Sequence, residues 1–151
     1  MVSIRNGLIS AIFATLAAGS MMLMNNALHR VPELHLARTL AAVLGYPDRL
    51  MVGWIAFLVL GILVFGVLFA VLAPKLPVRS YLVKGLIFGV MSWLLMMVVI
   101  MPLAGAGFFG VTRGHILALA ALVLNLVYWI VLSLIYRSDI EPGVSAVRIK
   151  R

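Results

Sequence analysis

Three histidines and a set of methionines are the residues of this 151-residue chain whose types could bind a metal ion or a haem. His29, His35 and His115 fall on the same side of the expected membrane spans, and Met97 and Met101 share one face of a helix at i, i+4 spacing. Thioether sulfur with imidazole nitrogen suits copper(I), and paired imidazoles can ligate haem iron. No His-x-x-x-His or Glu-x-x-His pair is present, and methionine is also an adaptable apolar filler, so core packing is the alternative interpretation.

The apolar runs of the chain offer no residues arranged for catalysis. Acid–base chemistry needs a buried titratable group with a partner, and these runs contain no aspartate, no glutamate and no histidine away from an end. Their one charged residue, Lys84, lies near an end, from which its amine can extend to the headgroups. The densest polar group, Glu33 with His35 and Arg38, is more simply a solvated helix face. We therefore expect a protein that is not an enzyme.

The composition excludes a soluble globular domain. Hydrophobic residues make up 65% of the chain and charged residues 11%, whereas soluble domains are about 45–50% apolar and about 25% charged. The absence of cysteine excludes disulfides and thiolate metal sites. A net charge of +8 would suggest nucleic acid for a soluble protein, but these basic residues lie at the ends of apolar runs. They indicate topology and contact with anionic lipid, so we expect membrane lipids, and no nucleic acid, as partners.

Four apolar runs predict an all-α membrane protein with four transmembrane helices. Each run is about 21 residues long, enough to cross a hydrocarbon core of about 30 Å. Such runs must be helical, because lipid offers the backbone no hydrogen bonds. The runs are residues 8–28, 52–72, 82–103 and 116–136 of a single membrane domain, 1–151.

The distribution of lysine and arginine predicts that both termini are cytoplasmic. Basic residues concentrate on the cytoplasmic side of membrane proteins. We therefore expect a multi-pass protein of the bacterial inner membrane with a cytoplasmic tail at 137–151. The side of the termini carries Arg5, Lys75, Arg79, Lys84, Arg137, Arg148, Lys150 and Arg151, against Arg30, Arg38, Arg49 and Arg113 on the other side.

Small and polar residues within the spans are expected to hold the helices together. Apolar side chains gain little by leaving lipid for one another, so close backbone approach and buried hydrogen bonds drive association. Gly85 and Gly89 form a Gly-x-x-x-Gly step, and Ser92 and Asn125 lie at similar depth in the third and fourth spans. We predict that Ser92 and Asn125 face the bundle interior as an interhelical clasp. Contact with an ion or a substrate is the alternative role for Asn125.

A short amphipathic helix is expected between the first two spans, over about residues 32–44. Pro32 and Glu33 are typical of a helix start, and Gly45 followed by Pro47 is typical of its end. Apolar residues fall on one side of this helix and polar ones on the other, which predicts a helix lying along the outer membrane boundary or over the mouth of the bundle.

The loop after the third span is apolar and rich in glycine. It contains Gly-x-Gly-x-x-Gly at residues 105–110, a pattern that binds dinucleotides only within a βαβ unit, so we reject that function. Phe108 and Phe109 would instead supply contact area against the bundle or another subunit.

Several stretches resemble a family of small four-span bacterial inner-membrane proteins of unknown function. The resemblance covers most of the chain from the first span to the fourth. It implies four spans and a bacterial source, and it supplies no mechanism. The matching stretches are His29-Arg30-Val31-Pro32-Glu33-Leu34 with Leu36-Ala37-Arg38, Lys84-Gly85-Leu86-Ile87-Phe88-Gly89, and Met101-Pro102-Leu103-Ala104-Gly105-Ala106-Gly107.

Three functions remain open from the sequence. We favour a non-catalytic accessory, structural or assembly subunit of a larger membrane complex, respiratory or photosynthetic by preference, with other membrane-protein subunits as partners and no cofactor. This choice rests on a compact bundle without interior chemistry that carries an apolar outer loop and a polar tail. The alternative is a periplasm-facing protein that handles copper or haem with the histidines and methionines above. A third function is a small channel or exporter, lined by Asn25, Asn26, Ser92 and Asn125.

Overall fold

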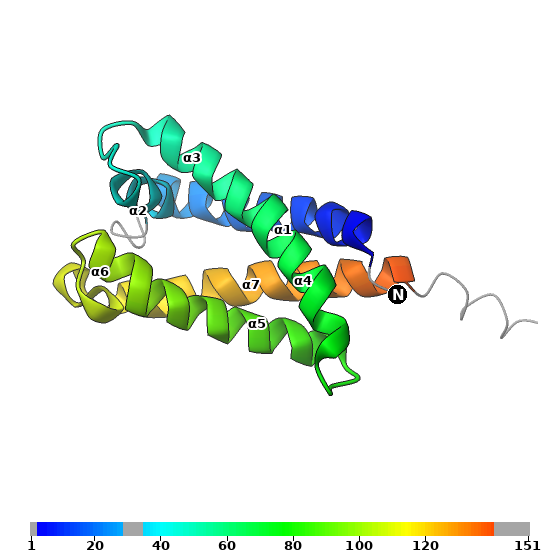
Figure 1. Cartoon of the computed structure of the whole chain (residues 1–151). Coiled ribbons are helices and arrows are strands. Elements are labelled where there is room, and N and C mark those ends of the chain that lie inside the picture. The colour runs from blue at the N-terminus through cyan, green and yellow to red at the C-terminus, as the bar shows by residue number, and fades with distance from the viewer. Residues whose placement is uncertain (1–2, 29–34, 141–151) are drawn as a thin grey trace, which may run out of the picture.

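The computed structural model of the chain describes residues 3–28 and 35–140. It contains four helical stretches long and apolar enough to cross a membrane, which confirms the predicted fold class (Figure 1). No strand occurs among these described residues. The candidate spans are Ile4–Leu28, Leu50–Lys75, Tyr81–Leu103 and Ile116–Tyr136.

The two middle spans are built from several helical segments each. Both contain a π-helical segment, a wider turn that is rare in proteins and frequent at functional sites. In chain order the elements are α1 (Ile4–Leu28), α2 (Leu36–Val43), α3 (Leu50–Leu58), the π-helix η1 (Val59–Phe65), α4 (Gly66–Leu72), the 3₁₀ helix η2 (Ala73–Lys75), α5 (Tyr81–Leu95), the π-helix η3 (Met96–Ile100), α6 (Met101–Leu103), the 3₁₀ helix η4 (Phe108–Arg113) and α7 (His115–Ile140).

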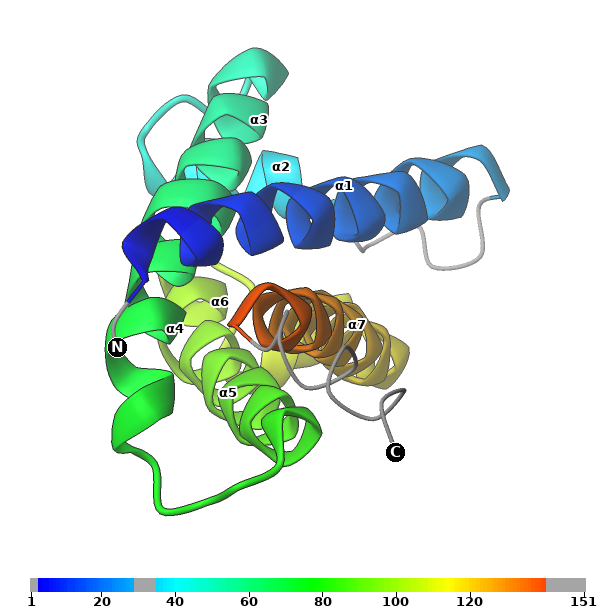
Figure 2. The ribbon, with the colours of Figure 1, turned by 90° about the vertical axis from the view of Figure 1, so that its right-hand side faces the viewer.

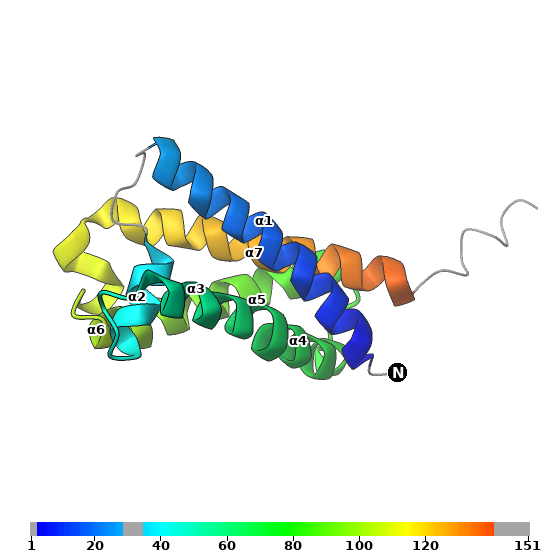
Figure 3. The same ribbon diagram turned by 90° about the horizontal axis from the view of Figure 1, so that it is seen from above.

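The last span, α7, is the helix on which the bundle is assembled. Both α1 and α5 pack along it, α1 also packs against η1 and α4, and α2 packs against α3. Figures 2 and 3 show α1 crossing over α7 and the second span. The second and third spans diverge from their connection towards the end of the bundle that holds α2 (Figure 1). The start of α1 and the end of α7 lie at the same end of the bundle, as four crossings require.

Glycines bring α5 and α7 into backbone contact. A Cβ atom on Gly85 would lie 2.5 Å from Ser133 Oγ and 2.7 Å from the carbonyl oxygen of Trp129. A Cβ on Gly89 would lie 2.9 Å from a methyl carbon of Leu126. Both positions of the predicted Gly-x-x-x-Gly step therefore face the neighbouring helix without room for a side chain, the geometry that favours helix association in lipid.

An aromatic cluster fills the bundle towards the end where the termini lie. Trp129 is buried at its centre and stacks on Phe88 with ring centroids 5.0 Å apart. Lys84 is also buried at this end, with Nζ 4.9 Å from the centroid of the Tyr81 ring. The cluster consists of Phe65, Phe69, Phe88, Tyr128, Trp129 and Tyr136.

The helix between the first two spans ends where the sequence predicts. Gly45 has a φ of +83°, its N–H donates to the carbonyl of Ala42, and the N–H of Tyr46 donates to the carbonyl of Ala41. This pair of bonds is the Schellman motif, in which a glycine terminates a helix. The helix begins at Leu36, and the predicted start signal at residues 32–33 lies outside the described residues.

Candidate functional site

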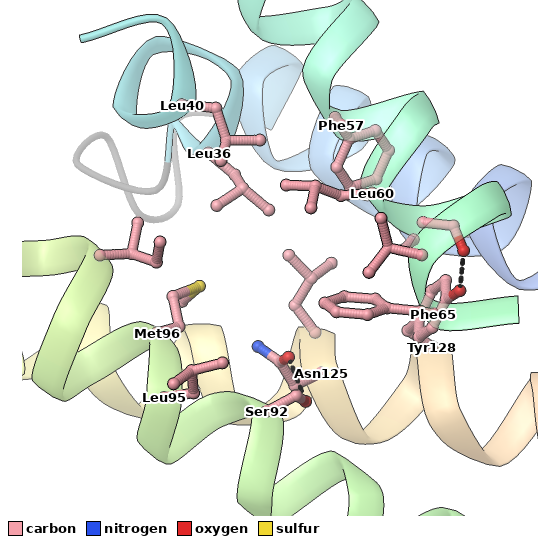
Figure 4. Close-up of a pocket in the computed structure, with 15 residues that line it drawn as sticks. Leu36, Leu40, Phe57, Leu60, Phe65, Ser92, Leu95, Met96, Asn125 and Tyr128 are labelled. Atoms are coloured by element: carbon pink, nitrogen blue, oxygen red, sulfur yellow. Dashed lines mark hydrogen bonds between the residues drawn. The ribbon is translucent and has the colours of Figure 1, made fainter. Parts of the chain in front are cut away.

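An apolar cavity of about 250 Å³ lies between the second and third spans. The second span contributes Phe57 and Phe65 among its walls, and the third contributes Leu95 and Met96 (Figure 4). Both π-helical segments supply lining residues. The cavity therefore lies where both middle spans depart from regular α-helix.

The cavity has a closed end and an open side. At the end that holds α2, Leu36 and Leu40 face the cavity and form its ceiling. Val64 and Leu95, on opposite walls, are 46% and 58% exposed. In a membrane, side chains exposed at this level of the spans face lipid. Each of the two middle spans therefore contributes a lining residue that is exposed at the outer surface of the bundle.

The floor of the cavity carries a chain of hydrogen bonds that joins the third and fourth spans. The indole Nε1 of Trp129 donates to Ser92 Oγ at 2.6 Å, and Ser92 Oγ donates to Asn125 Oδ1 at 2.9 Å. Asn125 Nδ2 donates to the carbonyl of Ala121 at 2.9 Å. The structure thus brings Ser92 and Asn125 together, at the edge of an apolar space rather than in a sealed interface.

A second polar contact joins the fourth span to the π-helical part of the second. The hydroxyl of Tyr128 donates to the carbonyl of Gly61, which lies within η1. The wider turn of a π-helix leaves backbone carbonyls free for outside donors. The absence of a side chain at Gly61 also makes room for Thr15 of α1, whose Oγ1 would be 2.5 Å from an added Cβ. Three spans therefore meet at this point of the cavity wall.

The opposite side of α2 faces a more polar hollow. His35, Arg38 and Arg113 are among the residues that line it. Arg113 Nη1 donates to Thr39 Oγ1 at 3.3 Å, which ties η4 to α2. The ceiling of the cavity thus separates an apolar space from a basic one.

Three of the five predicted metal ligands lie in the described part of the chain, in two different surroundings. Met97 and Met101 are buried in an apolar cluster beside the cavity, and His35 lies at the basic hollow. His29 and the side chain of His115 lie outside what the structure describes. Within the described residues, no group of three histidine, aspartate or glutamate side chains could hold a metal ion.

The glycine-rich loop is a series of turns that exposes two phenylalanines. Gly105, Gly107 and Gly110 have φ values of +73°, +69° and +66°, so the glycine spacing serves turns in the backbone. Phe108 is 63% exposed. Phe109 is 40% exposed and has a φ of +56°, a conformation unfavourable for a bulky side chain.

The polar residues considered for a channel lie in two separate places. Ser92 and Asn125 line the cavity. Asn26 lines a smaller hollow at the end of α1, together with Met22 and Trp54. Ser92 and Asn125 therefore line one hollow and Asn26 lines another.

The aromatic walls of the cavity are not evident from the sequence. Phe57 and Phe65 occur within an apolar run whose lipid-facing side is equally hydrophobic, so periodicity does not mark them. One signal for Tyr128 is its spacing of three residues from Asn125, which places both on one helix face.

Most of the chain matches the model of a known protein family. Residues 1–140 match DUF6789, a family of unknown function. No curated protein and no solved structure matches the chain.

Proposed function

The chain belongs to the DUF6789 family, and we propose that it is a non-catalytic subunit of a larger membrane complex that holds an apolar ligand between its second and third spans. The observation that carries this proposal is the cavity of about 250 Å³, whose lining residues Val64 and Leu95 are exposed at the surface of the bundle. An apolar cavity of about 150 Å³ in a protein stays dry and can bind benzene. The larger cavity here has room for a larger apolar group, which the surrounding bilayer can supply.

The polar groups around the cavity support binding rather than catalysis or ion transport. Ser92, Asn125 and Tyr128 are neutral side chains, and each makes a hydrogen bond within the bundle. Ion-coupled transport normally uses an acidic group within the membrane, and the four apolar runs contain neither aspartate nor glutamate. The site can therefore hold and orient an uncharged molecule.

Blocking the open side of the cavity tests this function. Leu95→Trp places a large ring at the rim, whereas the matched control Leu94→Trp changes a neighbouring exposed residue that does not line the cavity. Each protein is extracted in a mild detergent and examined by native mass spectrometry for a retained apolar small molecule. We expect the wild type and Leu94→Trp to retain one and Leu95→Trp to lose it. Equal occupancy in all three, or none in the wild type, would overturn the function.

The exposed outer loop supports the accessory role. Phe108 presents its ring at the surface. The partly exposed ring of Phe109 packs edge-on against Trp93, with centroids 5.7 Å apart, and its backbone conformation costs about 1–3 kcal/mol. We propose that these rings bind another membrane subunit. Gentle purification from native membranes should then yield a larger assembly, which the double variant Phe108→Ala, Phe109→Ala loses and Leu119→Ala, an exposed site on α7, keeps. A lone 16.4 kDa species from the wild type would contradict this role.

For localisation we propose the bacterial inner membrane, with both termini cytoplasmic and α2 at the periplasmic boundary. The excess of basic residues on the side of the termini supports this orientation. The chain has no cysteine, so single introduced cysteines report accessibility without background. Asp48→Cys, before the second span, should react with a membrane-impermeant reagent in intact cells, and Arg79→Cys only after permeabilisation. The reverse pattern would overturn the orientation.

A further inference from the structure

We propose that the ligand of this cavity is a quinone-type lipid, and that Asn125 donates a hydrogen bond to one of its ring carbonyls. This inference rests on the proposed function of the cavity and names the class of ligand. Three features support it: the orientation of the Asn125 amide, its depth in the membrane and the side chains around it.

The hydrogen bonds around Asn125 fix the orientation of its amide. Its Nδ2 lies 2.9 Å from the carbonyl oxygen of Ala121, and a carbonyl can only accept, so this end of the amide must be the nitrogen. Its Oδ1 accepts from Ser92 Oγ, which itself accepts from Trp129 Nε1. The Ala121 carbonyl decides the orientation, because a flipped amide would set two acceptor oxygens against each other, whereas Ser92 Oγ could then donate to the carbonyl of Gly89 instead.

One N–H of Asn125 is left over. An amide nitrogen carries two N–H groups, and Ala121 takes one of them. Among the described residues no acceptor is found for the other. Figure 4 shows the nitrogen turned away from Ser92, towards the space between the two middle spans. Asn125 is only partly buried, but an N–H group without an acceptor is costly within the hydrocarbon, because lipid tails provide none. The missing acceptor is therefore expected on the ligand.

The depth of Asn125 decides which acceptor can reach it. Asn125 is nine residues after Ile116 and eleven before Tyr136, the ends of the fourth span. At about 1.5 Å per residue it lies about 14 Å from one end and about 17 Å from the other, near the middle of a core about 30 Å thick. The ester groups of ordinary lipids stay at the boundary of that core. The acceptor must instead belong to a largely apolar molecule that carries its carbonyl into the hydrocarbon.

The walls beside Asn125 suit a flat ring. Phe57, Phe65 and Tyr128 line the cavity, and Phe65 meets Tyr128 edge-on with centroids 5.8 Å apart. Met96 adds a polarizable thioether on the facing wall. Aromatic rings pack well at such offset and edge-on angles. A ring carbonyl with an apolar tail fits both the donor and these walls, and the tail can leave between Val64 and Leu95.

A benzoquinone with a decyl chain tests the proposal, with decylbenzene as the probe that lacks carbonyls. Native mass spectrometry gives the occupancy of each probe on the full chain at a series of concentrations. Asn125→Leu removes the donor, whereas the control Leu119→Ala changes an exposed residue of the same helix that does not line the cavity. We expect Asn125→Leu to weaken quinone binding about fivefold, as loss of one hydrogen bond does, and to leave decylbenzene unchanged. Leu119→Ala should stay within about twofold of the wild type for both probes.

A second measurement does not depend on a variant that must fold. Infrared difference spectra of the wild type, with a ¹³C=O label on the quinone, isolate the carbonyl stretch of the bound molecule. The hydrogen bond should shift this stretch to a lower frequency than that of the same quinone in an apolar solvent. An unshifted carbonyl, or equal quinone affinity in Asn125→Leu and the wild type, overturns the ligand class. Cavity binding still stands in that case, provided that Leu95→Trp reduces the occupancy of both probes. If neither probe binds the wild type, the proposed function itself fails.

Discussion

Replacing Gly85 by alanine tests whether the α5–α7 contact holds the bundle together. The added Cβ would lie 2.7 Å from the carbonyl oxygen of Trp129, about 0.7 Å inside the 3.4 Å at which ordinary contact begins. The side chain of Ser133, 2.5 Å away, can rotate, but the carbonyl is backbone, so the helices must separate. Overpacking of this kind costs about 1–3 kcal/mol. Alanine regains about 1 kcal/mol in helix propensity, so the net loss is between about 0 and 2 kcal/mol.

Gly19→Ala is the matched control. Gly19 is also a buried helical glycine, but its added Cβ would meet only a ring carbon of Phe57 at 3.7 Å, an ordinary contact. Helix propensity alone then predicts a gain of about 1 kcal/mol. Each kcal/mol moves the melting temperature by about 2–4 °C at this chain length, so thermal unfolding in a mild detergent, followed by circular dichroism, should place Gly85→Ala about 2–12 °C below Gly19→Ala. Equal melting temperatures would refute the reasoning.

Two further predictions concern side chains beside the cavity. Tyr128→Phe removes the donor to the Gly61 carbonyl and should lower the free energy of unfolding by about 1 kcal/mol, and with it the melting temperature. The control Tyr46→Phe, on an exposed turn, should leave the melting temperature unchanged. Equal melting temperatures of the two variants would contradict the role of the Tyr128 hydroxyl. Met97→Leu with Met101→Leu conserves volume in a buried apolar cluster and should cost less than about 1.5 kcal/mol for each substitution. The metal content of the purified protein, measured by mass spectrometry, should not change, and loss of bound copper would show that these sulfurs are ligands.

The four spans follow from local properties of the sequence. A run long enough to cross a hydrocarbon core is helical whatever its neighbours are, so composition alone predicts it. The end of α2 is equally local, because the Schellman motif needs only the glycine at position 45 and the carbonyls of the preceding turn. The pairing of Ser92 with Asn125 could be predicted from their similar depth in the spans, because polar side chains within lipid form hydrogen bonds between helices.

The cavity could not be anticipated in this way. It depends on which helices are neighbours and on how far the second and third spans diverge, and neither is a property of one segment. In a membrane the lipid-facing and interior sides of a helix are both apolar, so the hydrophobic pattern does not show that Phe65 and Trp129 face the interior. The π-helical segments η1 and η3 are also hidden, because the residues in them are ordinary aliphatic ones.

The close contact between α2 and α3 determines how the bundle can deform. A Cβ on Gly53 would collide with the carbonyl of Ala37, so the ceiling of the cavity rests directly on the second span and must travel with it as one rigid body. The third span is fastened to the fourth by its glycine step and by the bond from Trp93 Nε1 to the Ala118 carbonyl. If the second span with α2 moved away from the third and fourth spans, the cavity would widen and could hold a larger ligand. Such a motion breaks the Tyr128 and Arg113 bonds that bridge them and leaves the Ser92–Asn125 floor intact.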